Sequence, residues 1–117
     1  MTKSLEDFFS AWAIADADAR GAQVSGTLGD SITYIDPRTE APLTNPDAVI
    51  AYVGGFSQMA PGMAVSVVHE SNSLNHARVA VQFGEGERSQ MGQYVADLDD
   101  NGKITRLVGF AGMGTPE

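Results

Sequence analysis

The stretch TYIDPRTEAPLTNPDAVIAYV, Thr33–Val53, joins the end of a predicted strand to the start of a predicted helix. The residues SITYID (31–36) alternate in polarity and are rich in β-branched and aromatic side chains, which is typical of a strand. Proline lacks the N–H that a strand ladder needs, so Pro37 should end this strand. Asp36 is therefore expected at the strand end, with its carboxylate on the same face as Tyr34.

The second half of this stretch predicts a helix with a well-defined start. Asn45 is a favourable N-cap, Pro46 occupies the first helical position, and Asp47 lies near the positive end of the helix dipole. Apolar residues then recur at helical spacing, and the Pro61-Gly62 pair should end the helix. The buried stripe is expected to comprise Val49, Tyr52, Val53 and Phe56.

The chain before this stretch has helical spacing, and the chain after it has strand alternation. One helix is predicted from Ser4, as N-cap, to about Arg20, and the glycine-containing segment 21–31 should form a helical turn or two and a loop. The tail GMGTPE (112–117) is expected to be loose. Four strands are predicted at 63–71, 76–84, 89–98 and 103–111, joined by turns at NSLN, GEGE and DDNG.

Helices followed by a meander of strands define the α+β class. We expect one domain over residues 1–117, in which the helices pack on one face of a curved antiparallel sheet. At this length, folding should bury roughly two-thirds of the surface that the unfolded chain exposes, so one sizeable core is possible.

The composition argues against several kinds of partner. The chain contains seven Lys and Arg residues and 15 Asp and Glu residues, which gives a net charge of -8. This charge repels phosphate backbones and anionic membrane surfaces, so we expect neither nucleic acid nor a membrane as partner. The chain has no cysteine, its start does not resemble a signal peptide, and it has no long apolar run, so we expect a cytoplasmic protein.

Four features occur together in this chain. They are an amphipathic N-terminal helix with an inward Trp12, a strand that closes in Asp36-Pro37, a capped helix that ends near Pro61-Gly62, and the sequence DDNGKI before the last strand. Their order resembles the NTF2-like superfamily, and within it the SnoaL-like and ketosteroid-isomerase-like branches, over residues 4–111. The resemblance implies a cone-shaped fold around a small apolar ligand, and a homodimer formed through the outer sheet face.

The resemblance also implies roles for individual residues. In ketosteroid isomerases the aspartate of the Asp-Pro pair is the general base that moves a proton beside a carbonyl, which makes Asp36 the candidate base. Those enzymes stabilise the enolate oxygen with a tyrosine on the first helix and a protonated aspartate on the penultimate strand. The corresponding positions here are Trp12 and Tyr94, or Gln93 if the register is shifted by one residue. Indole and phenol can both donate a hydrogen bond, although the changed donors put a steroid substrate in doubt.

Each candidate also has a structural alternative. Asp36 could accept hydrogen bonds from its own turn before Pro37, and Trp12 and Tyr34 could be ordinary core residues. Methionines could form an adaptable apolar wall around a ligand, or simply fill the core. With Asp36 and Tyr94 as the catalytic candidates, the residues predicted to bind substrate are Trp12, Tyr34, Phe56, Met59, Met63, Met91 and Gln93.

No pattern in the sequence predicts a metal site. His69 and His76 fall on different predicted strands without a third ligand to join them. The segment DLDDNGKI (97–104) resembles a calcium loop, but Val108 occupies the position where the bidentate glutamate should be. A hairpin turn at Asn101-Gly102 is the simpler interpretation. We therefore expect no metal and no cofactor.

Two hypotheses about function follow. The first is an isomerase-like or cyclase-like enzyme that acts on a small, apolar carbonyl compound, with Asp36 as the group that transfers the proton and Tyr94 as a donor to the enolate oxygen. The second is a non-catalytic domain that binds a small ligand or serves a structural role, in which Asp36 only caps a turn.

Overall fold

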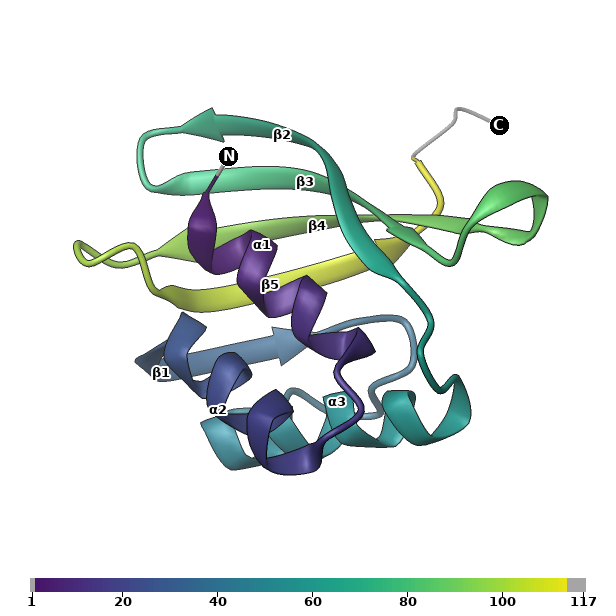
Figure 1. The fold of residues 1–117 in the computed structure, drawn as a ribbon. Helices are drawn as coiled ribbons and strands as arrows, with labels where there is room; N and C mark the ends of the chain where they lie inside the picture. Colours follow the sequence, from purple (N-terminus) through teal and green to yellow (C-terminus); the bar gives the residue numbers. More distant parts are fainter. Residues whose placement is uncertain (1, 114–117) are drawn as a thin grey trace.

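The computed structural model describes residues 2–113, which form helices and strands as the α+β prediction requires (Figure 1). Residues 114–117 of the tail that is expected to be loose lie outside the described residues. The elements in chain order are α1 (Lys3–Ser10), the 3-10 helix η1 (Ala11–Ala13), α2 (Ala17–Thr27), β1 (Leu28–Ile35), α3 (Pro46–Met59), β2 (Val65–Ser73), β3 (His76–Phe83), the 3-10 helix η2 (Gly86–Arg88), β4 (Gln90–Leu98) and β5 (Ile104–Ala111).

The strands form one curved sheet in the order β1-β5-β4-β3-β2 (Figure 1). Strands β2 to β5 are the predicted antiparallel meander, whereas β1 pairs with β5 in parallel. The sheet is therefore mixed and not wholly antiparallel. Parallel pairing needs a long crossover connection, and α3 with the three intervening strands supplies it.

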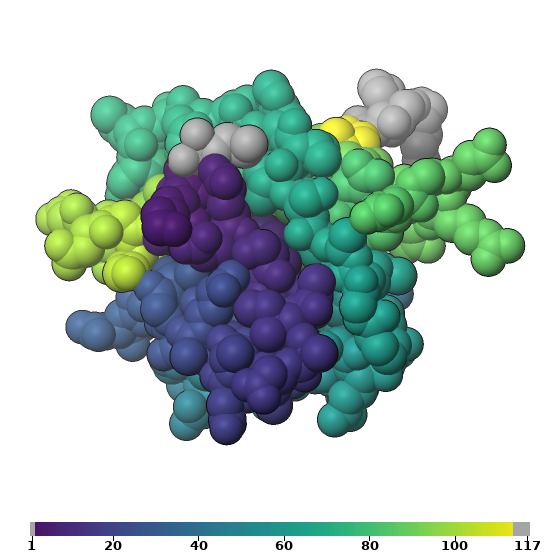
Figure 2. All heavy atoms as spheres, in the orientation of Figure 1, coloured from purple at the N-terminus to yellow at the C-terminus, as the bar shows by residue number. Residues whose placement is uncertain are grey.

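The helices cover one face of the sheet and enclose the core with it (Figure 1). Helix α1 contacts α2 and β2, and α2 packs in turn on α3. From this side, α1 and α2 cover much of the molecule, while the connection between β3 and β4, in green, projects from it (Figure 2). The largest of the fully buried side chains are Trp12, Tyr34, Phe8, Phe9 and Leu5.

The N-terminal helix is shorter than the sequence predicts. It does not run from Ser4 to about Arg20 but ends, through η1, at Ala13. Asp16 then caps a new helix by accepting a hydrogen bond of 2.8 Å from a backbone N–H in its first turn. The segment 21–31, expected to form a helical turn or two and a loop, instead holds the end of α2 and the start of β1, without a loop between them. Alanine is compatible with either arrangement, so the alanine-rich spacing hides the break.

Arg20 holds this break together. Its Nη1 donates to the carbonyl oxygens of Ile14 at 2.9 Å and Ala15 at 3.3 Å, and to Ser57 Oγ on α3 at 3.2 Å. The carbonyl groups at the end of a helix have no helical partners, and hydrogen bonds from a charged donor satisfy them. Arg20 therefore connects the end of η1, which carries Trp12, to α3.

The N-cap of α1 is Thr2 and not Ser4, whereas the predictions for α3 and for the DDNG turn agree with the structure. The Asn45 side chain accepts an N-cap hydrogen bond of 2.9 Å, and α3 ends at Met59, before Pro61-Gly62. The DDNG segment forms a hairpin turn. Its Asp99 carboxylate accepts two backbone N–H groups of the turn, each at 2.9 Å, and Gly102 has the left-handed φ of 77°.

A close approach within the sheet positions a buried phenol. Tyr94 on β4 pairs with Gly109 on β5, and a Cβ atom at Gly109 would lie only 2.4 Å from the Tyr94 ring. The next strand over is β1, where Tyr34 pairs with Leu107 of β5. The absence of a side chain at Gly109 therefore lets the Tyr94 ring lie across β5 toward Tyr34.

We expect Gly109→Ala to destabilise the protein by roughly 1–3 kcal/mol, because the added methyl group would force the Tyr94 ring out of its place. Gly55→Ala is the matched control, since a Cβ atom there would have no heavy atom within 4 Å. In a helix this change should stabilise by roughly 0.5–1 kcal/mol. Urea unfolding gives the free energy of unfolding of both variants. A Gly109→Ala protein as stable as the wild type would contradict the close packing of Tyr94 on Gly109.

Candidate functional site

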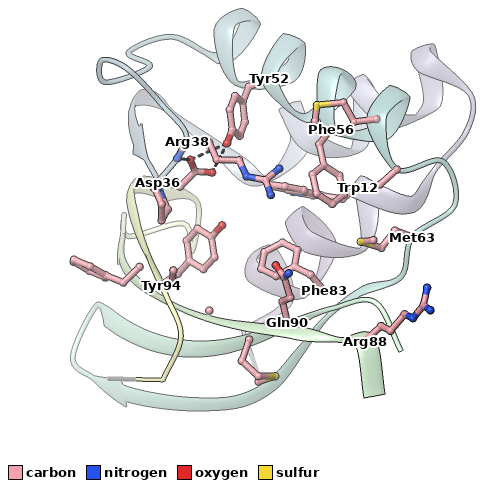
Figure 3. Close-up of a pocket in the computed structure, with 17 residues that line it drawn as sticks. Trp12, Asp36, Arg38, Tyr52, Phe56, Met63, Phe83, Arg88, Gln90 and Tyr94 are labelled. Atoms are coloured by element: carbon pink, nitrogen blue, oxygen red, sulfur yellow. Dashed lines mark hydrogen bonds between the residues drawn. The ribbon is translucent and has the colours of Figure 1, made fainter. Parts of the chain in front are cut away.

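A cavity of about 360 Å³ opens between α3, the loop after β1 and the start of β4 (Figure 3). Its wall is mainly apolar, and a volume of this size suits a ring-sized small molecule. The charged residues that border it are Asp36, Arg38 and Arg88, and the apolar ones include Trp12, Phe56, Met59, Met63 and Phe83.

Asp36 follows the end of β1, and its side chain is held by four donors. Its Oδ1 accepts hydrogen bonds from the backbone N–H groups of Arg38 at 2.8 Å and Thr39 at 3.2 Å. The Tyr52 hydroxyl donates to Oδ1 at 2.7 Å and to Oδ2 at 2.6 Å (Figure 3). The Tyr34 hydroxyl donates to Oδ2 at 2.7 Å. Asp36 therefore caps its own turn and also borders the cavity, so the two interpretations of this residue are compatible.

All three tyrosines of the chain belong to one network, in which Tyr34 and Tyr52 contact this carboxylate and Tyr94 contacts Tyr34. The buried Tyr34 hydroxyl donates its proton to Asp36, so its oxygen is left to accept a hydrogen bond. The Tyr94 hydroxyl lies 3.3 Å from it, which places a hydrogen-bonded row from Tyr94 through Tyr34 to Asp36. The three phenols come from β1, α3 and β4.

Burial keeps these phenols protonated. It raises the pKa of Tyr94 to about 12, with the charge of Asp36 acting in the same direction and the hydrogen bond with Tyr34 opposing it. Burial also raises the pKa of Tyr34 well above its ordinary value, and burial together with the hydrogen bond to Asp36 raises the pKa of Tyr52. All three side chains are therefore neutral donors at pH 7.

Trp12 lies at the centre of an aromatic cluster beside the cavity. Only 2% of the residue is exposed, and its ring centroid lies 4.8 Å from that of Phe56 and 5.9 Å from that of Phe83. The indole N–H is buried and has no hydrogen-bond partner among residues 2–113. An unsatisfied buried donor costs about 1–3 kcal/mol. The ring thus packs as a core residue, while its polar atom is left for another acceptor.

Five of the seven residues predicted to bind substrate border the cavity. Trp12, Phe56, Met59 and Met63 border the cavity with the catalytic candidates Asp36 and Tyr94, as does Met91 at the start of β4. Strand alternation nevertheless puts the Met91 side chain on the opposite face of β4 from Tyr94.

Two of those predictions are wrong as to position. Tyr34 is fully buried behind Asp36 and does not border the cavity, because its ring fills the core below the carboxylate. Gln93 lies on the outer face, where its side chain donates to the carbonyl oxygen of Met113 at 2.9 Å. Alternation along β4 turns Gln93 away whenever Tyr94 faces inward, so the register without a shift is correct.

Two polar residues of the site, Tyr52 and Arg38, were not predicted from the sequence. Tyr52 was assigned to the buried stripe of α3, yet its hydroxyl is the donor that contacts both oxygens of Asp36. Its place in an apolar stripe gave no sign of a partner 16 residues earlier. Arg38 follows Asp36 by two residues, and its proximity to the candidate base was the one available signal.

Two further properties of residues 2–113 bear on the site. No three His, Asp or Glu side chains of this range are placed to hold a metal ion. None of its helices has the length and the apolar composition needed to span a membrane.

Comparison with known proteins identifies the fold. No protein-family model matches the sequence, and no curated protein matches it. A SnoaL-like family protein from Agrobacterium tumefaciens, described as a candidate isomerase, has a TM-score of 0.78 at 20% identity, over 92% of both chains. A protein with a ketosteroid-isomerase-like fold from Catenulispora acidiphila, in complex with trimethylamine, has a TM-score of 0.75 at 13% identity, over 95% of this chain and 86% of that one. SalBIII, an epoxide hydrolase/cyclase-like enzyme of pyran ring formation in salinomycin, has a TM-score of 0.71 at 18% identity, over 95% of this chain and 89% of its own.

The chain therefore has the NTF2-like fold of SnoaL-like and ketosteroid-isomerase-like proteins, and the fold expected from the sequence is confirmed. Identities between 13% and 20% establish the fold alone. Because one fold can host many activities, the function has to be argued from the side chains of the cavity.

We expect the tyrosines of the native protein to resist ionisation at about pH 10, where a free tyrosine is half ionised. The folded-state pKa of Tyr94, about 12, lies above the unfolded value. The stabilisation from its neutral phenol is therefore complete below about pH 10 and is lost as the pH rises toward 12. Absorbance titration with and without denaturant gives the pH midpoint of tyrosine ionisation in the unfolded and the native protein. The signal reports only on this site, because all three tyrosines belong to it. A native midpoint near that of free tyrosine would contradict the network.

Proposed function

We propose that the protein is an acid–base enzyme of the isomerase-like or cyclase-like kind that acts on a small, largely apolar carbonyl compound. The observation that carries the proposal is the Asp36 carboxylate, which is buried, 8% exposed, and borders an apolar cavity. The Tyr94 hydroxyl borders the same cavity, with only the Tyr34 hydroxyl between it and Asp36. A base and a neutral donor are thus close enough to act on adjacent atoms of one substrate.

In this proposal Asp36 removes a proton from a carbon atom next to the carbonyl group. The electrons of the broken C–H bond form an enolate, and its oxygen accepts a hydrogen bond from Tyr94, whose hydroxyl proton turns away from Tyr34 to donate it. Asp36 then returns the proton to a different carbon atom, which is an isomerisation. Alternatively, the enolate carbon attacks a second carbonyl group, which closes a ring, and Asp36 returns the proton to the alkoxide oxygen that this attack forms. The indole N–H of Trp12, buried without a partner among the described residues, is a second candidate donor.

Tyr52 controls access to the base in this mechanism. Its hydroxyl contacts both carboxylate oxygens, and the half-buried Tyr52 borders the cavity, whereas Tyr34 lies wholly behind Asp36. A substrate carbon atom therefore reaches the carboxylate only when Tyr52 gives up at least one of its two contacts.

A second candidate function is a non-catalytic binding domain, and one observation favours it. Four donors already occupy the two oxygens of Asp36, which is the environment of a carboxylate with a structural role. The similarity to SalBIII in fold supports the enzymatic alternative, since that protein is described as an epoxide hydrolase/cyclase-like enzyme.

The isomerisation of cyclohex-3-enone to its conjugated isomer tests the enzymatic proposal. We expect the wild-type protein to accelerate the reaction, and Asp36→Asn to lose about 100-fold or more of that acceleration, because an amide cannot accept the proton. Ultraviolet absorbance follows the product, and deuterium uptake from D2O, followed by NMR, reports the proton transfer itself.

Asp97→Asn is the matched control for this experiment. Asp97 pairs with His76 at 2.7 Å away from the cavity, so its loss should leave the rate unchanged. Thermal unfolding of both variants shows whether a lost rate is a lost fold. A wild-type protein that does not exceed the buffer rate, or an Asp36→Asn protein that keeps the wild-type rate, would favour the binding domain.

The homodimer is also a proposal, and exposed apolar side chains support it. Val68 on β2 is 48% exposed and Val95 on β4 is 43% exposed. We expect light scattering at micromolar concentration to give the mass of a dimer, and Val95→Lys to shift it toward the monomer. A monomer mass for the wild type would contradict this.

A further inference from the structure

Two of the seven basic residues of the chain border the cavity, and neither has an acidic partner among residues 2–113. Arg38 lies in the loop after β1, and Arg88 ends η2 in the connection between β3 and β4. Neither guanidinium group makes a hydrogen bond or an ion pair with any residue in the range 2–113. Arginine carries its charge at any physiological pH, so both groups are positive without a partner.

The charge of the cavity differs in sign from that of the whole protein. The chain has a net charge of -8, whereas the cavity is bordered by the two arginines and one carboxylate, Asp36. These three charges leave an excess of one positive charge. One negative charge on a ligand would therefore make the occupied cavity neutral.

Arg38 is placed at the reactive end of the cavity. Its backbone N–H donates to Asp36 Oδ1 at 2.8 Å, which fixes the start of its side chain beside the carboxylate. Its guanidinium group then extends into the cavity toward Trp12, between Asp36 and the aromatic wall (Figure 3). The positive charge of Arg38 lowers the pKa values of Tyr52 and Tyr94, in opposition to the effect of burial, which places it near both phenols.

Arg88 lies farther from Asp36. It belongs to the connection between β3 and β4, which projects from the body of the molecule (Figures 2 and 3). Its contribution to a ligand in the cavity is therefore a weaker, longer-range attraction, which salt would screen more strongly.

We propose that the ligand of this cavity is a carboxylate-bearing apolar carbonyl compound, whose carboxylate binds the Arg38 guanidinium group while its carbonyl-bearing ring lies against the aromatic wall. This inference rests on the proposed function for the carbonyl group but not for the carboxylate. The planar guanidinium group of arginine matches a carboxylate through two parallel hydrogen bonds. The charge excess of one fits a monoanion, and Asp36 would repel a dianion such as a phosphate monoester.

This arrangement gives the carboxylate an orienting role. With its negative charge held at Arg38, between Asp36 and the aromatic wall, the ligand cannot turn around without placing the carboxylate in the apolar wall. Such a reversal would leave a charge desolvated and unpaired, which is strongly unfavourable. Arg38 would therefore act as a specificity-determining residue and not as a catalytic residue.

The test compares two ring-sized ketones of nearly the same shape, the anion 4-oxocyclohexanecarboxylate and the neutral 4-oxocyclohexanecarboxamide. Trp12, the single tryptophan of the chain, borders the cavity, so its fluorescence reports binding of either compound. We expect the carboxylate to bind about tenfold more tightly than the carboxamide, and Arg38→Gln to abolish this preference. Arg88→Gln should reduce it by less, and added salt should weaken only the binding of the carboxylate.

Arg78→Gln is the matched control, because it removes the same charge from an exposed position of β3 that does not border the cavity. It should keep the full preference. Equal affinity for the two compounds, a preference unchanged in Arg38→Gln, or no binding of either compound at millimolar concentration would overturn the proposal.

The Asp36→Asn variant separates this inference from the proposed function. It should lose proton transfer but bind the carboxylate more tightly than the wild type, because a negative charge beside the ligand is gone. A wild-type protein that isomerises cyclohex-3-enone without preferring the carboxylate would overturn the inference alone. A preference for the carboxylate that depends on Arg38, without any proton transfer, would contradict the proposed enzyme and retain the inference.

Discussion

The structure depends on the way in which one buried carboxylate is satisfied. A charge withdrawn from water is tolerated only where hydrogen bonds replace its hydration, and the Asp36 carboxylate receives them from two backbone amides and two phenols. The donors come from β1, its following loop and α3, and Tyr34 extends the network to β4. The same group therefore holds α3 against the sheet and defines the polar end of the cavity. Asp36 therefore contributes both to the stability of the fold and to the chemistry of the ligand site.

The parts of the fold that the sequence predicts well are those with local signals. Helix α3 has its N-cap, its proline and its terminating pair within its own sequence, and the meander has a turn-forming group between each pair of strands. The break after Ala13 was missed because alanine carries no signal against a continuous helix, and the side chain that holds the break, Arg20, acts on residues five and six positions before it. The parallel pairing of β1 with β5 depends on the whole topology, which no single segment specifies.

The residues of the candidate site also divide into those that the sequence predicts and those that only the tertiary structure reveals. Asp36 and Tyr94 were found because the family resemblance indicated their positions in the chain, and the structure brings both to one cavity. Tyr52 was missed because periodicity describes where a ring packs and does not indicate what its hydroxyl reaches. The partners of a buried polar atom are a property of tertiary packing. Tyr34 shares a face with Asp36 as predicted, but it is fully buried and donates a hydrogen bond to the carboxylate from behind instead of binding substrate.

The central position of β5 has a consequence for how the molecule folds. This strand lies between β1 and β4 in the sheet, yet it is the last of the strands in the chain. Tyr34 and Tyr94, on its two neighbours, can meet only when β5 has been inserted between them, with Gly109 beneath the Tyr94 ring. During synthesis the N-terminal helices and the first four strands emerge before this can happen. The contact between Tyr34 and Tyr94 therefore requires the last strand of the chain, whereas the contacts of Asp36 with Tyr34, Tyr52 and its own loop come from segments made earlier.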